Sequence, residues 1–138
     1  MTAYHGGKQR IGKELAQIIY EESLDIEEEY DFDIKGYCEP FSGMMGVYRH
    51  IPELFRQTHP KIKYLAGEIN ESVVKMWNAA AKKGWKPPEK NYPRDKWEDL
   101  KYNGKTSAIK GFVGHVNTFK GDYFMSYFKH KNSKIKTN

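Results

Sequence analysis

The sequence predicts an α/β protein with a parallel sheet, and three observations support this class. Short apolar runs at residues 34–38 and 61–66 are each closed by turn-forming residues, as strands are. Apolar residues recur at helical spacing before, between and after these runs. Strands and helices that alternate in this way form parallel sheets, and ligands bind beyond the carboxyl ends of such strands.

The first helix is expected over residues 9–22, because apolar side chains recur there every three to four positions. These side chains are Ile11, Leu15, Ile18 and Ile19. Residues 23–33 are strongly acidic, and we expect a loop or a ragged helix end there.

The first strand, residues 34–38, is closed by Glu39-Pro40 and leads into a tight loop over residues 41–46. A helix is expected from Val47, with an interruption near Pro52 because proline lacks the amide donor. The second strand, residues 61–66, ends at Gly67-Glu68-Ile69-Asn70. The helix after it is expected to continue to about Lys83.

From Gly84 onward the chain is polar and rich in proline, so irregular structure is expected before a helix at about 105–116. A turn at 119–123 is expected to lead into a last short helix, with a frayed tail at 131–138. We therefore divide the chain into an α/β part, residues 1–83, and a basic, aromatic segment, residues 84–138.

Composition excludes several classes of protein. The chain has 138 residues and a single cysteine, which excludes an internal disulfide framework or a multi-cysteine zinc site. We expect Cys38 to be a buried structural residue, and the histidines show no metal-ligand spacing. No long apolar run or signal-peptide core is present, so we expect no membrane span and a cytoplasmic location.

The two halves of the chain carry opposite charge. Residues 1–69 hold 8 Lys and Arg against 12 Asp and Glu, whereas residues 70–138 hold 15 against 6. A basic half is typical of nucleic-acid binding, although lysine-rich surfaces also serve solubility alone. Aromatic residues lie between these lysines; some could stack on bases, but most are more simply core. The candidate DNA-binding residues are Lys101, Lys105, Lys110 and Lys120.

Three segments suggest a binding site when they are taken together. Gly6-Gly7-Lys8 precedes a helix, whose start favours anions, and Lys8 could meet a carboxylate. The glycine-containing loop at 41–46 would let a small molecule lie against bare backbone. Glu68, at the next strand end, suits the two hydroxyls of a ribose. Together the segments suit an adenosine-containing cofactor that carries a carboxylate.

Each segment also has a simpler interpretation. Gly-Gly-Lys is a common surface turn, and residues 41–46 would serve as an ordinary strand-to-helix loop. Glu68 would equally serve as the acidic charge at a helix start capped by Asn70.

The order of these segments resembles the N-terminal part of DNA adenine-N6 methyltransferases. The matching residues are Tyr4-His5-Gly6-Gly7-Lys8, Glu39-Pro40-Phe41-Ser42-Gly43 and Gly67-Glu68-Ile69-Asn70. The later segments Gly111-Phe112-Val113-Gly114 and Phe119-Lys120-Gly121-Asp122-Tyr123-Phe124 are similar to those of phage or viral members. The resemblance covers roughly residues 4–128 and implies a partial Rossmann-like sheet with flanking helices that binds S-adenosylmethionine.

The resemblance also implies a role for each matching residue. Tyr4 would pack on the cofactor, and Lys8 would lie near its methionine end or the target base. Phe41, Ser42 and Gly43 would form the cofactor loop. Glu68 would hold the ribose, and Ile69 would line the adenine pocket.

Two departures from the family pattern matter. The second loop glycine of the family falls at Met45, where a side chain could crowd the cofactor. The Asp-Pro-Pro-Tyr motif that holds the target adenine is absent, and the Pro87-Pro88 pair lacks both the acceptor and the ring. We therefore expect no catalytic residue here. The chain would be a fragment, one subunit of a split enzyme with a second chain carrying that motif, or a non-catalytic relative that binds nucleic acid without cofactor.

Overall fold

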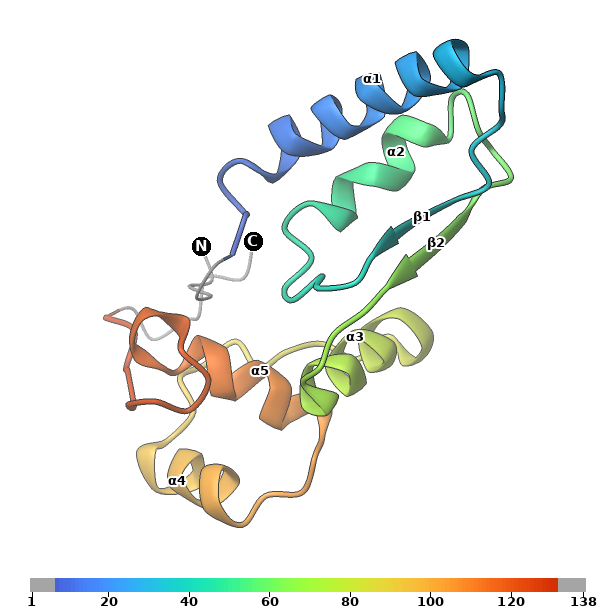
Figure 1. Cartoon of the computed structure of the whole chain (residues 1–138). Coiled ribbons are helices and arrows are strands. Elements are labelled where there is room, and N and C mark those ends of the chain that lie inside the picture. Colours follow the sequence, from blue (N-terminus) through green and yellow to red (C-terminus); the bar gives the residue numbers. More distant parts are fainter. Residues whose placement is uncertain (1–6, 132–138) are drawn as a thin grey trace. The chain divides into compact units, whose positions relative to one another are not determined.

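The structure is a computed structural model that describes residues 7–131 (Figure 1). The described residues belong to two compact units, residues 7–68 and residues 69–131. This division by contacts falls between Glu68 and Ile69, whereas the composition of the sequence changes at residue 84. Expectations for Tyr4 and for the tail beyond Lys131 lie outside the described residues.

The first unit, residues 7–68, contains the sheet. Its elements are α1 (Gly12–Tyr30), β1 (Gly36–Glu39), the 3₁₀ helix η1 (Tyr48–His50), α2 (Ile51–Phe55) and β2 (Lys63–Ala66). Strands β1 and β2 run parallel, with Tyr37 opposite Tyr64 and Cys38 opposite Leu65. The protein is therefore mixed α/β with a two-stranded parallel sheet, as far as the described residues go. Both strand expectations are confirmed to within two residues at each end.

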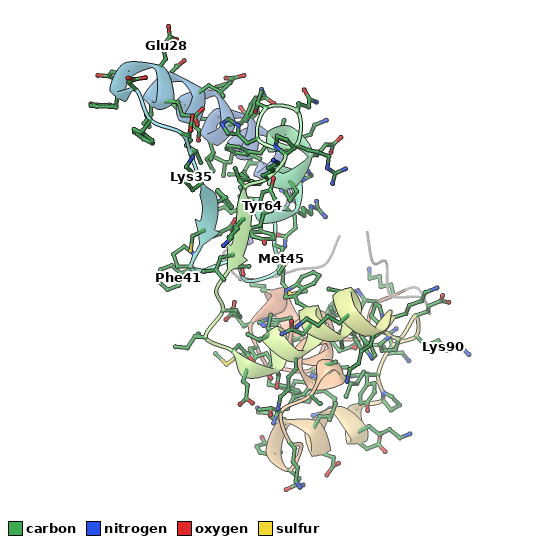
Figure 2. All side chains as sticks on the ribbon, turned by 90° about the vertical axis from the view of Figure 1, so that its right-hand side faces the viewer. Glu28, Lys35, Phe41, Met45, Tyr64 and Lys90 are labelled. Atoms are coloured by element: carbon green, nitrogen blue, oxygen red, sulfur yellow. The ribbon has the colours of Figure 1, made fainter. Side chains whose placement is uncertain are left out.

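Helices α1 and α2 cover one face of this sheet. Ala16 of α1 and Ile51 and Phe55 of α2 are fully buried, and Tyr37 and Tyr64 pack against them from the strands. Figure 2 shows the Tyr64 side of the sheet facing these helices. Alternate strand residues face the two sides of a sheet, so this face takes every second residue of each strand.

The expectation that Cys38 is buried is wrong. Its side chain is exposed, and Leu65 beside it is 64% exposed. Both residues lie on the sheet face opposite the helices, and among the described residues of this unit no helix covers that face. An apolar run does not reveal which of two alternating faces finds a partner.

Two expectations about helices in this unit need correction. Residues 23–30 continue α1 instead of forming a loop, and the helix ends where Asp31 adopts a left-handed φ of 51°. Glu27 explains the added turns, because its carboxylate accepts a hydrogen bond from the Ile34 amide and lies 2.8 Å from His59 Nε2. Pro52 does not interrupt a helix but lies in the first turn of α2, where its missing amide costs nothing.

The second unit, as described over residues 69–131, is helical. Its elements are α3 (Glu71–Lys83), α4 (Arg94–Tyr102), α5 (Ala108–Val116) and the 3₁₀ helix η2 (Phe119–Gly121). The end of α3 at Lys83 is confirmed. Asn70 caps α3 by accepting a hydrogen bond from the Ser72 amide at 3.0 Å, and Ser107 caps α5 in the same manner.

The core of this unit lies between α3 and α5. Gly111 of α5 packs so closely on the Ser72 carbonyl that no side chain would fit there. Helix α4 contributes the buried Trp97 to this core. The sequence did not predict this helix, because its residues are polar and follow several prolines. The buried apolar residues are Val73, Met76, Trp97, Phe112, Val113, Val116 and Phe124.

The last expected helix is absent from residues 122–131. The chain there returns along Asn117–Phe119 instead, with an antiparallel bridge between Thr118 and Tyr127. In the described part of the chain, no helix is both long enough and apolar enough to cross a membrane.

Candidate functional site

Two of the three sequence segments meet at the carboxyl ends of β1 and β2. Ser42, in the loop after β1, donates from its amide and its Oγ to the Gly67 carbonyl, at 2.8 and 2.9 Å. The Gly67 amide in turn donates to the Glu39 carbonyl at 2.9 Å. A side chain at Gly67 would collide with the Pro40 backbone, so the loop and the end of β2 are held against each other.

The third segment, of which the structure describes Gly7 and Lys8, packs on the same loop through Lys8. A Cβ atom built on Gly46 would lie 2.9 Å from the Lys8 carbonyl carbon, closer than such atoms come in proteins. A side chain at Gly12 would likewise collide with the Gly46 carbonyl. These two glycines let the start of α1 lie directly against the loop that follows β1.

The loop between β1 and η1 has a conformation that favours glycine at two positions. Gly43 has φ of 49°, and Met45 has φ of 55°. The Met45 amide donates to the Ser42 carbonyl at 2.7 Å, which closes the turn. A left-handed φ costs a non-glycine residue about 1 kcal/mol or more. Met45 therefore stands, strained, at a position whose backbone conformation favours glycine.

The candidate residues differ in exposure. Ser42 and Gly43 are buried, whereas Lys8 is exposed and Phe41 is 88% exposed. Figure 2 shows the Phe41 ring projecting away from the helices. Glu68 is half-buried at the end of the first unit. Lys8 and Phe41 are therefore the members of this set that solvent reaches most.

One candidate residue lies outside the first unit. Ile69 is 97% exposed and is the first residue of the second unit. Residues Lys8, Phe41, Ser42, Gly43 and Glu68 all belong to the first unit.

A tyrosine–glutamate pair near this site was not singled out by the sequence. Tyr37 Oη donates to Glu39 Oε2 at 2.9 Å, on the sheet face that the helices cover. Burial, followed by the hydrogen bond to Glu39, raises the pKa of Tyr37 far above its ordinary value, and burial also raises the pKa of Tyr48. Both phenols stay neutral donors at neutral pH. Tyr37 and Glu39 lie two positions apart in one strand, so both face the same side of the sheet, and this spacing is the sequence signal that pairs them.

The four candidate lysines of the second unit do not share one environment. Lys110 Nζ donates to the Gly104 carbonyl at 2.5 Å and lies 5.9 Å from the Phe124 ring, so it supports the fold. Lys101 Nζ lies 5.4 Å from the Trp97 ring and 5.1 Å from the exposed Tyr102 ring. Lys105 is exposed.

Lys120 differs again, because it is exposed and stands over an exposed ring. Its Nζ lies 5.6 Å from the centroid of Phe119. Ammonium groups close to aromatic faces are attracted to them and remain available to phosphates.

Metal chemistry has no support in the described part of the chain. Within residues 7–131, no three His, Cys, Asp or Glu side chains are grouped so that they could hold a metal ion.

Neither a family model, nor a curated protein, nor a solved structure matches the chain.

Proposed function

We propose that residues 7–68 form the S-adenosylmethionine-binding part of a DNA adenine-N6 methyltransferase. The observation that supports this most is the meeting of three sequence segments at the carboxyl ends of β1 and β2. Ligands of parallel α/β sheets bind at this edge. The coarse fold is mixed α/β; that its two strands belong to a Rossmann-like sheet is part of the proposal.

The residues present fit the chemistry of this cofactor. Gly43 adds no side chain to the loop after β1, and the Glu68 carboxylate suits ribose hydroxyls. The exposed Lys8 ammonium suits the carboxylate of the methionine moiety, and the exposed Phe41 ring offers an apolar surface to the cofactor. When bound, the cofactor would supply the methyl group.

Methyl transfer itself needs groups that these residues do not supply. The residue before the Pro87-Pro88 pair is Lys86, which cannot accept a hydrogen bond from an adenine amino group. The residue after the pair is Glu89, which has no aromatic ring to stack on the base. We therefore propose that the catalytic motif lies outside residues 1–138, either elsewhere in a longer protein or on a second polypeptide. We further propose that the substrate is DNA and that the protein acts in the cytoplasm of a bacterium or of a virus-infected cell.

Calorimetric titration of the purified chain with S-adenosylmethionine tests the cofactor site. We expect saturable binding that weakens by about tenfold or more in Glu68→Ala, which loses a hydrogen bond to a charged group. Glu28→Ala, an exposed carboxylate on α1, is the matched control and should bind like the parent chain. Circular dichroism would verify that both variants fold. Equal affinity in the two variants, or no binding at all, would refute the proposed site.

A second candidate function is nucleic-acid binding by the second unit without any cofactor. Its support is the charge of residues 70–138, where 15 Lys and Arg outnumber 6 Asp and Glu. Binding of this kind should weaken steeply as salt is added, because phosphate contacts release counterions. Glu68→Ala distinguishes the two functions, because it should weaken binding of S-adenosylmethionine and leave the affinity for nucleic acid unchanged.

A further inference from the structure

Two phenylalanine side chains of the second unit are exposed side by side. Phe119 is 53% exposed and Phe128 is 38% exposed, with ring centroids 6.3 Å apart. The His130 ring continues the row, 5.2 Å from Phe128. We name these three rings the aromatic platform.

The backbone beneath the platform is held rigidly. The Phe119 amide donates to the Ser126 carbonyl, and the Phe128 amide donates to the Asn117 carbonyl, both at 2.9 Å. Asn117 and Thr118 are fully buried, and Thr118 Oγ1 donates to the Gly114 carbonyl at 2.8 Å. Phe119 and Phe128 are thus presented to solvent by a hydrogen-bonded support, and His130 beside them is half-buried with its Nε2 against the Val116 carbonyl. A ligand that meets such a support has little conformational entropy to remove.

Phe119 and Phe128 are not part of the hydrophobic core of this unit. Trp97, Phe112 and Phe124 fill the interior, whereas Phe119 and Phe128 leave much of their apolar surface in water. An exposed apolar patch rimmed by polar groups is typical of an interaction site.

Positive charge surrounds the platform. Lys120 Nζ lies 5.6 Å from the Phe119 ring, and Lys129 and Lys131 are exposed on either side of His130 in the chain. One acidic residue, Asp122, lies in the same turn and is already engaged by a partner. Rings flanked by ammonium groups complement a ligand with flat apolar groups and regularly spaced negative charges.

We propose that the aromatic platform stacks unpaired nucleic-acid bases while the lysines around it contact the phosphates. Base faces are available for stacking only where the strand is single or locally open, because a duplex buries them against neighbouring pairs. The partner is therefore single-stranded nucleic acid. This inference rests on the second candidate function above and names the form of nucleic acid and the residues that bind it.

The test is fluorescence anisotropy of a labelled short oligothymidylate titrated with the full chain at low salt and without cofactor. Phe119→Ala and Phe128→Ala should each weaken binding by about tenfold, the usual effect of removing one stacking ring. Phe119→Trp should retain affinity, whereas Phe119→Leu, which is apolar but has no ring, should bind as weakly as the alanine variant. Tyr30→Ala, an exposed ring in the first unit, is the control and should bind like the parent chain.

The possible outcomes separate this inference from the function on which it rests. Tight binding that is unaffected by Phe119→Ala and Phe128→Ala, or a preference for duplex of the same sequence, overturns the platform but leaves nucleic-acid binding standing. Equal affinity of Phe119→Leu and the parent chain would also overturn it, because stacking needs the ring. No binding to single strand or duplex at low salt would refute both.

Discussion

Ser42 donates two hydrogen bonds to the Gly67 carbonyl oxygen, one from its backbone amide and one from Oγ. These bonds join the loop after β1 to the end of β2, although 25 positions separate the two residues. The joined ends place Phe41 and Glu68 on one edge of the sheet in the first unit. The meeting of the loop after β1 with the end of β2 therefore depends in large part on one carbonyl.

We expect Ser42→Ala to lower the free energy of unfolding by about 1 kcal/mol, the usual contribution of one hydrogen bond. The loop would keep the amide bond and lose only the Oγ bond, so cofactor binding should weaken without disappearing. Urea unfolding followed by circular dichroism measures the change. Ser126→Ala, an exposed serine in the second unit, should unfold like the parent chain.

Met45→Gly should raise the free energy of unfolding by about 1 kcal/mol, since glycine adopts a positive φ without the cost that methionine meets. It should also tighten S-adenosylmethionine binding, because it removes a side chain from the loop. Thermal unfolding and calorimetric titration measure the two effects. Met44→Gly is the matched control: Met44 is not among the positive-φ residues, so glycine there should lower stability. A lower unfolding temperature for Met45→Gly would contradict the strain argument.

Glu27 should make the first unit sensitive to acid. A hydrogen bond from the Ile34 amide, and then the contact with His59, hold the pKa of this carboxyl below its ordinary value, against the opposing effect of burial. A carboxyl with a lowered pKa stabilises the fold above its ordinary pKa, and that stability is lost as the pH falls through the lowered value.

Urea unfolding at a series of pH values from neutral to about pH 3 measures this loss. Glu27→Gln should be less stable than the parent chain at neutral pH, and the difference should shrink in acid. Glu28→Gln, one position along α1 and exposed, should show the parent's pH profile. A constant difference between Glu27→Gln and the parent at every pH would show that the charge plays no part.

Asn117→Ala should lower the free energy of unfolding by about 2 kcal/mol or more, because buried polar partners lose their hydrogen bonds. Asn117 Nδ2 donates to Asn91 Oδ1 at 3.1 Å, and Asn117 Oδ1 accepts from the Tyr92 amide. Asn78→Ala, an exposed asparagine on α3, should have little effect. Chemical unfolding compares the two variants, and equal stability would mean that this network contributes nothing.

Sequence reasoning identified the strands and the turns between them because their information is local. The runs at 34–38 and 61–66 are bounded by residues that end strands, and Asn70 and Gly84 begin and end α3. It missed α4 because a short polar helix has no strong periodicity, and Trp97 is its only buried residue. It ended α1 too early because the partners of Glu27 come from residues 34 and 59.

The sequence by itself determined the order of the three candidate segments, the opposite charges of the two halves, and the local starts of most elements. Only the tertiary structure decided that Gly46 lies against Lys8, that Cys38 faces outward, and that Lys110 is tied to Gly104. It also decided which rings form a core and which, like Phe119 and Phe128, stay in water. Turn and capping preferences act between neighbouring residues, whereas burial depends on partners that only folding brings together.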